Sequence, residues 1–346
     1  MSGLPYRHQR VQRLRKLVGR RAARDDDGSF VLEGVNLLEE ALGAGTEIEA
    51  VYVDADWAGR SPSGGPAAGA APARPGAAPD GPGTATARPG AAPAEAAAAP
   101  VGPVKVPAGP GEGEQDGPLA SVPTAARLST LLQRCHAAGA RIFELDHGVL
   151  PRVAGTVTPQ PVLTVARIPR CTLYDLGARR PRLVLVCVDV RDPGNAGTVA
   201  RSAWAAGADA VVCTEGTVDP WNPKAVRASA GAVLRISMVS AGGAAEVLAE
   251  MGTWGLRRWG TVVRGGADYA AADLSMPSAL VLGNEASGLP AAALAGVLDG
   301  LLSIPMAGGA ESLNVGMAAT VLCFEAARQR RRGRIGGEHG PASPPD

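Results

Sequence analysis

The sequence predicts an α/β protein with two domains: a carboxy-terminal domain on a parallel β-sheet and a smaller amino-terminal α/β domain. The chain has 346 residues, a length that suits about two domains. Continuous apolar runs such as residues 183–188 are typical of strands buried on both faces of a parallel sheet. Segments with apolar residues at helical spacing separate these runs, and such alternation indicates α/β architecture.

The amino-terminal domain is predicted over residues 1–168. It begins with a helix whose apolar residues recur at helical spacing among many arginines, and the three aspartates at 25–27 predict a turn after it. Three further segments read as strand, helix and strand, and three more follow later in the chain. In order, these are a strand at 29–34, a helix at 35–42, a strand at 48–53, a helix at 126–138, and strands at 140–145 and 162–166.

An insertion interrupts this domain at residues 59–122. It consists almost wholly of Ala, Gly and Pro and has no Leu, Ile, Phe or Trp before Leu119. Such a segment cannot bury enough apolar surface to offset its ordering entropy, which predicts disorder. A linker between independent domains is the alternative, but the patterns on either side indicate pieces of one small domain.

A linker at residues 169–182 leads to the second domain, predicted over residues 183–332, and a disordered tail is predicted at 333–346. The buried strands expected in the second domain are residues 183–188, 210–213, 236–239, 260–263, 279–282 and 300–304.

Three loops of this domain place glycine and polar residues after a predicted strand, the position where open parallel sheets bind ligands. Each loop alone has a structural explanation as well. Asn195 and Ser312 could be helix N-caps, Arg201 could form a surface ion pair, and Glu285 could lie near a helix dipole. The loops carry, in chain order, N-x-G-x-x-x-R from Asn195, L-G-N-E-x-x-G-L from Leu282, and I-P-M-x-G-x-x-x-S-L-N-V from Ile304.

Together the three patterns resemble, in the same order and at the same strand ends, the motifs of the SpoU (TrmH-type) family of tRNA/rRNA 2'-O-ribose methyltransferases, within the SPOUT superfamily. The resemblance covers residues 183–330. A weaker one relates residues 7–168 to the family's ribosomal-protein-like RNA-binding domain, from which the insertion at 59–122 departs.

The resemblance implies a deep trefoil knot in the second domain and a homodimer formed through that domain, with the active site at the subunit interface. It implies S-adenosylmethionine as the cofactor and structured RNA as the substrate. The residues implied to bind the cofactor are Leu282, Gly283, Gly288, Ile304, Met306 and Leu313. The implied catalytic residues are Arg201, Asn195, Glu285, Ser312 and Asn314.

The reaction implied is methyl transfer to a ribose 2'-hydroxyl, which must be placed in line with the methyl group and lose its proton. Arginine is a very weak base, so a phosphate clamp is the simpler role for Arg201, and a role as base stays open. A full amino-terminal domain favours rRNA over tRNA. An antibiotic-resistance methyltransferase and a non-catalytic knotted protein that binds RNA or assists ribosome assembly stay open too, whereas the missing G-x-G-x-x-G disfavours a dehydrogenase.

The charge and the cysteine content limit which partners and ligands the protein is expected to bind. With 34 Lys and Arg against 33 Asp and Glu, the net charge of +1 excludes a uniformly basic coat, so RNA contacts must be local, as in the arginine stripes at 7–24 and 328–334. The five cysteines form no metal-binding pattern and predict reduced thiols, mostly in the core, with no metal. No apolar run is long enough to span a bilayer, and we expect a cytoplasmic protein.

Overall fold

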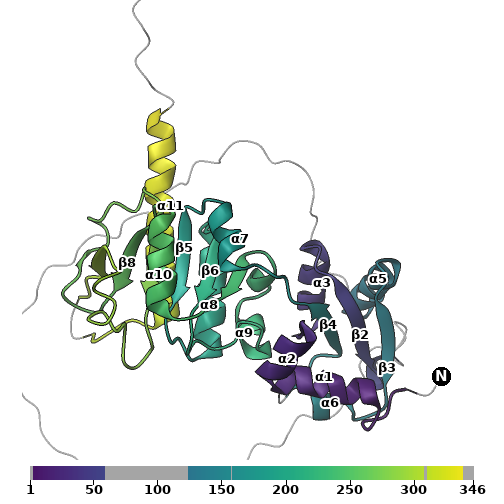
Figure 1. Ribbon diagram of the computed structural model, residues 1–346. Helices are drawn as coiled ribbons and strands as arrows, with labels where there is room; N and C mark the ends of the chain where they lie inside the picture. The colour runs from purple at the N-terminus through teal and green to yellow at the C-terminus, as the bar shows by residue number, and fades with distance from the viewer. Residues whose placement is uncertain (1–2, 59–123, 157, 308–309, 338–346) are drawn as a thin grey trace, which may run out of the picture. The chain divides into compact units, whose positions relative to one another are not determined.

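The computed structural model describes residues 3–58, 124–156, 158–307 and 310–337 (Figure 1). The insertion predicted to be disordered, residues 59–122, lies outside the described residues, as does the end of the chain from residue 338.

The amino-terminal domain contains a four-stranded sheet in the order β1-β4-β2-β3. Its strands are β1 (Ser29–Glu33), β2 (Ile48–Asp54), β3 (Arg141–Leu145) and β4 (Val162–Arg167). β2 and β3 pair in parallel, and β4 is antiparallel to both β1 and β2. Strands from both sides of the insertion therefore belong to one sheet, as the sequence patterns indicate.

Helices cover both faces of this sheet (Figure 1). On one face, α1 buries Val11, Leu14 and Leu17 against Tyr52 and Leu163, and α6 joins the same cluster. On the other face, α3 and α5 pack with the opposite set of strand side chains. The helices of the domain are α1 (Gln9–Gly19), α2 (Arg21–Asp27), α3 (Val35–Gly43), α4 (Ala55–Ala58), α5 (Thr124–Ala137) and α6 (Leu150–Val153).

The turn predicted at the aspartates 25–27 is wrong, because these residues form the last turn of α2. Asp27 accepts hydrogen bonds from Arg13, which offsets the weak helix propensity of aspartate. The chain turns at Gly28 instead, whose φ of 68° suits a residue without a side chain.

The second domain holds a seven-stranded sheet in the order β7-β6-β5-β10-β8-β11-β9, joined by parallel pairings. Its strands are β5 (Leu183–Cys187), β6 (Ala210–Cys213), β7 (Ser237–Ser240), β8 (Arg257–Thr261), β9 (Ala267–Asp268), β10 (Ser278–Leu282) and β11 (Gly300–Ser303). Strand side chains are buried on both faces: Leu280 and Leu282 join one apolar cluster and Ala279 and Val281 another. This confirms the parallel α/β prediction.

Helices flank this sheet, and two of them, α8 and α11, are in close contact. Gly316 of α11 has no side chain, and a Cβ there would lie 2.8 Å from Thr198 of α8. Next to it, the hydroxyls of Ser202 and Thr320 are 2.6 Å apart. The helices of the domain and its approach are α7 (Leu173–Ala178), α8 (Pro193–Ala205), α9 (Pro223–Ala228), α10 (Ala244–Thr253) and α11 (Val315–Gly337), with a 3₁₀ turn at Ala232–Leu234.

Two segments expected to lack regular structure are partly helical. The linker at 169–182 contains α7, which starts with a capping box between Thr172 and Asp175. α11 continues to Gly337, past the predicted start of the tail at 333. Strand order does not establish how the chain threads, so the trefoil knot stays a prediction.

All five cysteines lie within the described residues, and four of them are buried. All five cysteines are free thiols, and burial raises the pKa of Cys323 to about 12. Cys171 is only half-buried and is not a core residue. Across the described ranges we find no His, Cys, Asp and Glu cluster suited to a metal ion, and no helix with the length and hydropathy to cross a bilayer.

Candidate active site

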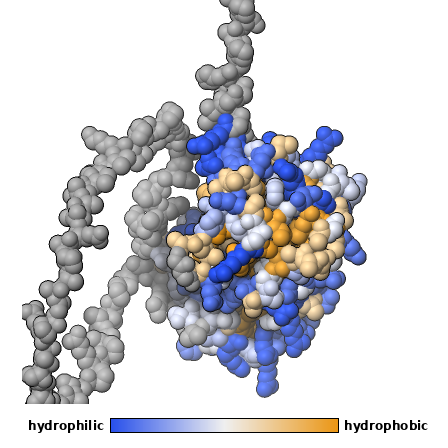
Figure 2. Space-filling view, turned by 90° about the vertical axis from the view of Figure 1, so that its left-hand side faces the viewer, coloured by the Kyte–Doolittle hydropathy of each residue, from blue (hydrophilic) through white to orange (hydrophobic). Residues whose placement is uncertain are grey.

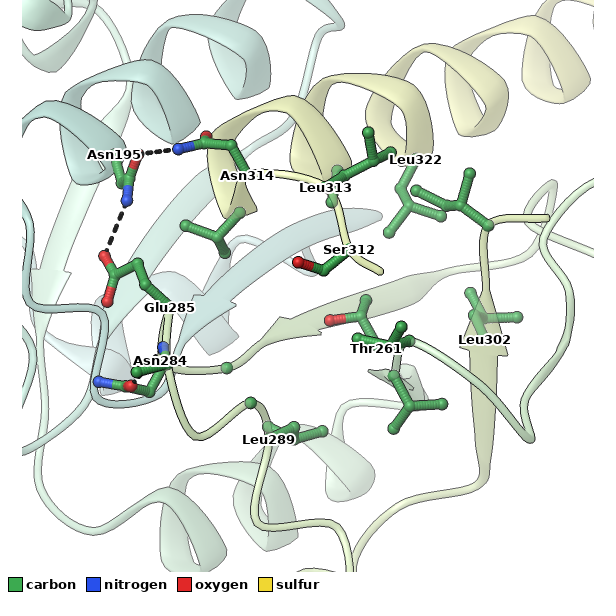
Figure 3. A pocket seen from close by; sticks show the side chains of 18 of the residues that line it. Asn195, Thr261, Asn284, Glu285, Leu289, Leu302, Ser312, Leu313, Asn314 and Leu322 are labelled. Atoms are coloured by element: carbon green, nitrogen blue, oxygen red, sulfur yellow. Dashed lines mark hydrogen bonds between the residues drawn. The ribbon is translucent and has the colours of Figure 1, made fainter. Parts of the chain in front are cut away.

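A cavity of about 350 Å³ opens at the carboxyl edge of the second sheet, within the size range of small-molecule sites (Figure 3). The ends of β8, β10 and β11 and the starts of α8 and α11 surround it. Its apolar wall includes Val262, Leu289, Leu302, Ile304, Ala318 and Leu322. Its polar lining includes Asn195, Thr261, Asn284, Glu285, Ser312 and Asn314.

Three polar side chains from the three predicted motifs form a continuous hydrogen-bonded relay at the cavity (Figure 3). Asn314 Nδ2 donates to Asn195 Oδ1 at 2.8 Å, and Asn195 Nδ2 donates to Glu285 Oε1 at 2.9 Å. The start of α8, the loop after β10 and the start of α11 are thereby held together. The spacing of the motifs in the sequence gave no sign that these side chains bond to one another.

Glu285 also fixes the backbone of the loop before α8. Its Oε2 accepts from the amide of Arg191 at 3.1 Å and its Oε1 from the amide of Asp192 at 3.0 Å. Partial burial opposes ionisation of the carboxyl, but the bonds from Asn195 and the two amides outweigh it, so the pKa of Glu285 lies below its ordinary value. At neutral pH Glu285 is therefore an ionised acceptor and a weak base.

The helix caps differ from the structural alternatives considered for single residues. Asp192, not Asn195, caps α8, because its side chain accepts from the amide of Asn195. Asn314, not Ser312, caps α11, since its Oδ1 accepts from the amides of Gly316 and Met317. Ser312 is left exposed on the cavity lining.

Gly283 lies where the backbone after β10 passes closest to the returning loop. A Cβ at this position would be 2.3 Å from the amide nitrogen of Leu289, a separation that real side chains do not reach. Gly288 in the same loop has a φ of 70°, which favours glycine. Both glycines line the cavity and shape the loop.

The remaining predicted residues divide between the cavity and its surroundings. Ile304, Met306 and Leu313 line it, whereas Leu282 does not: its side chain is fully buried in the core behind the cavity. Arg201 also lies outside the lining. It is an exposed residue of α8.

Comparison with known proteins agrees with this geometry. Residues 182–324 match the SpoU rRNA Methylase family, and residues 8–70 match the MRM3-like substrate binding domain. The chain is 37% identical to the 23S rRNA (guanosine(2553)-2'-O)-methyltransferase RlmP of Bacillus subtilis over 54% of this chain and 72% of the relative. The chain belongs to the SpoU methylase family.

Further relatives agree with this membership. The 23S rRNA (guanosine-2'-O-)-methyltransferase RlmB of Ralstonia nicotianae is 36% identical over 59% of this chain and 83% of its own length. A solved RNA 2'-O ribose methyltransferase superposes with a TM-score of 0.63 at 28% identity, covering 95% of this chain and 99% of that one. An rRNA methyltransferase from Sinorhizobium meliloti, with a TM-score of 0.66 at 24% identity over 94% and 96% of the two chains, has the same fold.

The cavity of this SpoU methylase suits S-adenosylmethionine, the cofactor of the family. Its apolar wall suits the flat, weakly polar adenine ring. Because Gly283 and Gly288 line the cavity without side chains, a ligand can approach the backbone of this loop closely.

The sequence patterns missed part of this SpoU cavity. Thr261 ends β8, lines the cavity and donates from its hydroxyl to the carbonyl of Val281 at 2.8 Å. A polar residue at the end of a buried strand could have identified it. Asn284 lies inside a predicted motif and bonds to the backbone carbonyl of Asp189 at 2.8 Å. Leu289 is the last residue of the second motif, whereas no pattern indicated Leu322; they enter the cavity from the loop and from α11, respectively.

Replacing Gly283 with alanine is expected to abolish cofactor binding. The added methyl would displace the loop at Leu289 and close part of the cavity. Isothermal titration with S-adenosylmethionine measures the effect, and Gly296→Ala is the control because a Cβ there meets no atom within 4 Å. Unchanged affinity in Gly283→Ala would show that this loop does not contact the cofactor.

Replacing Glu285 with glutamine is expected to loosen the loop before α8. The new amide group would point a donor at the N–H of Arg191 or Asp192, so at least one hydrogen bond is lost. Hydrogen exchange at these two amides should accelerate by about tenfold, the equivalent of one bond of ~1.4 kcal/mol. Glu215→Gln, at an exposed carboxylate of another loop, should leave the exchange rate of these two amides unchanged.

The same bonds should depend on pH in the wild type. The pKa of Glu285 is lowered in the folded protein, so its stabilising effect is present above the ordinary value of 4.5 and is lost as the pH falls through the lowered value. Exchange at the two amides should therefore accelerate only below about pH 4.5 in the wild type, and Glu285→Gln should lack this dependence.

Proposed function

We propose that this chain transfers the methyl group of S-adenosylmethionine to a ribose 2'-hydroxyl of rRNA. The observation that carries the proposal is the cavity at which all three motif loops meet, with the Glu285–Asn195–Asn314 relay joining them. The named functions of the relatives RlmP and RlmB, both 23S rRNA 2'-O-methyltransferases, support rRNA as the substrate. Action on rRNA implies the cytoplasm as the place of the reaction.

The relay residues act by positioning. Both oxygens of Glu285 and the side-chain amides of Asn195 and Asn314 are occupied by bonds within the protein. Glu285, with its lowered pKa, is a poor acceptor for the proton of the ribose hydroxyl. When bound, S-adenosylmethionine supplies an electrophilic methyl group on its sulfonium. The protein must hold the 2'-hydroxyl in line with it, and Ser312, exposed on the lining, is placed to bond to the nucleotide.

Arg201 is the residue we assign to the RNA phosphate next to the target ribose. Its side chain is exposed on α8, and among the described residues it has no hydrogen-bond or ion-pair partner, so its donors are free. A guanidinium clamps a phosphate through two parallel hydrogen bonds and stabilises the negative charge that develops on the ribose oxygen.

A transfer assay tests the proposed function. The protein, labelled S-adenosylmethionine and unmodified rRNA transcripts should give label at 2'-O-methyl positions, mapped against RNA from cells without the protein. Label in tRNA alone would show that the substrate is tRNA and not rRNA. No label in either RNA, with RNA binding that Arg201→Ala leaves unchanged, would identify a non-catalytic RNA-binding protein instead.

We also propose that two copies associate through the exposed side of α11. Met317 and Phe324 lie seven residues apart on α11 and are 61% and 43% exposed, and Leu313, just before the helix, is 40% exposed. Apolar side chains also gather within a hydrophilic surround on the face shown in Figure 2. Because Leu313 lines the cavity as well, a partner on this side would complete the site.

The oligomeric state tests this surface. Met317→Glu combined with Phe324→Glu is expected to convert a dimer into monomers, because four charges would be buried at a two-fold interface. Light scattering after size-exclusion chromatography gives the mass. Met276→Glu, at a methionine outside α11 whose exposure of 50% lies between those of Met317 and Phe324, should remain dimeric. A wild-type monomer at all concentrations would overturn the proposal.

A further inference from the structure

The basic residues near the amino terminus fall into two groups in the structure. Arg13 bonds to Asp27 and Glu49 at 2.6 Å, and Arg24 is buried against Asp219. These two arginines serve the fold. The second group is exposed and, within the described part of the chain, has no carboxylate partner. Its members are Arg7, Arg10, Arg15, Lys16 and Arg20, together with Arg152 of α6.

Aromatic rings hold three arginines of the second group in place. The guanidinium of Arg152 lies 3.7 Å from the centre of the Tyr6 ring, and that of Arg15 lies 5.9 Å from it. Arg10 lies 4.4 Å from the centre of the Phe143 ring. Stacking on a ring restrains a guanidinium without using its N–H donors. These side chains are therefore oriented but still able to bond.

We propose that this surface, formed by Arg10, Arg15 and Arg152 with Tyr6 and Phe143, binds the sugar–phosphate backbone of the RNA substrate. The proposal rests on the proposed function, since it assigns a surface to the RNA. Oriented, unpaired guanidinium groups are suited to phosphates, which accept two parallel hydrogen bonds each. We call it the α1–α6 surface.

The α1–α6 surface contacts phosphates and does not read bases. The faces of Tyr6 and Phe143 that could stack on a base are occupied by arginines, and Phe143 also lies against Tyr52, with ring centres 5.3 Å apart. Because arginines lie over both rings, binding there depends on charge. It should be sensitive to salt and indifferent to sequence.

Contacts between the domains bring α2, the helix that follows α1, to the edge of the second sheet where the cavity opens. Arg24 pairs with Asp219, and Arg21 donates to the carbonyl of Thr217 at 3.2 Å. Both acceptors belong to the loop after β6, at the carboxyl edge of the sheet. In the same loop, the amide of Val218 donates to Val190, just before the first motif. An RNA bound at the cavity can therefore extend along the amino-terminal helices.

Among the described residues, two arginines on the opposite face of the amino-terminal sheet are paired with carboxylates. There Arg127 pairs with Glu39, and Arg235 of the second domain pairs with Glu40 at 2.8 Å. Arg134 of α5 is exposed on this side, away from the rings. It provides a control charge in the same domain.

RNA binding by charge-matched variants tests the surface. Arg10→Gln, Arg15→Gln and Arg152→Gln are combined in one variant, and Arg134→Gln, Arg179→Gln and Arg180→Gln, at exposed arginines outside both arginine stripes, in a control that loses the same charge. Binding of an rRNA transcript and of an unrelated structured RNA of equal length is measured over a range of salt. The first variant should bind both RNAs at least about tenfold more weakly, and its salt slope should fall by about 2 to 3, roughly one for each lost phosphate contact. The control should bind like the wild type.

Tyr6→Leu adds a test that changes no charge. It should weaken RNA binding about threefold by releasing Arg15 and Arg152. Thermal unfolding is measured to confirm that the variant folds.

Two outcomes would overturn the proposal that the α1–α6 surface binds RNA. They are equal weakening of RNA binding in the control variant, and no weakening in the first variant. In the transfer assay the first variant should raise KM for RNA while kcat at saturating RNA is unchanged. If no variant transfers methyl groups but the binding pattern holds, the proposed function fails and the α1–α6 surface stands.

Discussion

Replacing Arg201 with alanine is expected to lower the rate of methyl transfer by about 100- to 1,000-fold, the usual cost of losing a donor that stabilises charge in a transition state. The side chain is exposed, lies outside the cavity lining and has no ion-pair or hydrogen-bond partner among the described residues. Its loss should therefore leave the fold and the affinity for S-adenosylmethionine unchanged. Single-turnover transfer with saturating RNA, together with cofactor titration, separates these effects.

Two further variants of this experiment separate a clamp from a general charge effect. Arg201→Lys keeps the charge but lacks the two-pronged donor geometry, so it should recover only part of the rate. Arg180→Ala removes an exposed arginine just before β5, at the amino edge of the same sheet, and should transfer like the wild type. Full activity in Arg201→Ala would remove Arg201 from the mechanism.

The position of the site could be predicted from the sequence because the ends of buried strands can be recognised there. Five consecutive buried residues in each of β5 and β10 mark the sheet interior, and the first glycine or polar residue after them marks its carboxyl edge. β8 was predicted from residue 260, but it begins at Arg257. Its first residues are charged, and Arg258 is accommodated by an ion pair with Asp299 at 2.7 Å. A hydropathy pattern does not predict such a tertiary partner.

The hydrogen bonds within the site could not be predicted from the sequence, because they too depend on tertiary partners. Asn195, Glu285 and Asn314 are far apart in the chain, and each fitted a local explanation by itself. The structure shows instead that Asp192 and Asn314 cap the helices, which leaves Asn195 free to join the relay. Which of several Asn, Asp and Ser residues caps a helix depends on where the helix begins to within one residue, and sequence patterns do not fix that.

Replacing Arg24 with alanine is expected to destabilise the protein by about 3 to 5 kcal/mol, the range for breaking a buried ion pair. The side chains of Arg24 and Asp219 are 3% and 6% exposed, with a nitrogen–oxygen distance of 2.6 Å. Arg24 also donates to the carbonyl of Leu17, and Asp219 accepts from the amide of Trp221. The alanine variant leaves the Asp219 carboxylate buried without its cation, and the thermal midpoint should fall by about 10 °C for a protein of this size.

A neutral pair and an exposed arginine of the same helix distinguish this cause from a loss of helix packing. Arg24→Met combined with Asp219→Asn removes both charges and keeps an acceptor oxygen for Trp221, so it should recover most of the stability that Arg24→Ala loses. Arg21→Ala breaks only an exposed pair with Asp25 and one bond to a backbone carbonyl, so it should cost about 1 kcal/mol or less. If Arg24→Ala melts like Arg21→Ala, the buried pair does not hold the domains together. If it melts early and the neutral pair does not, the isolated Asp219 charge is the cause. The neutral variant then also tests whether the ion pair places the amino-terminal helices for RNA, since it keeps most of the stability and removes the bonds that Arg24 donates to Asp219 and Leu17.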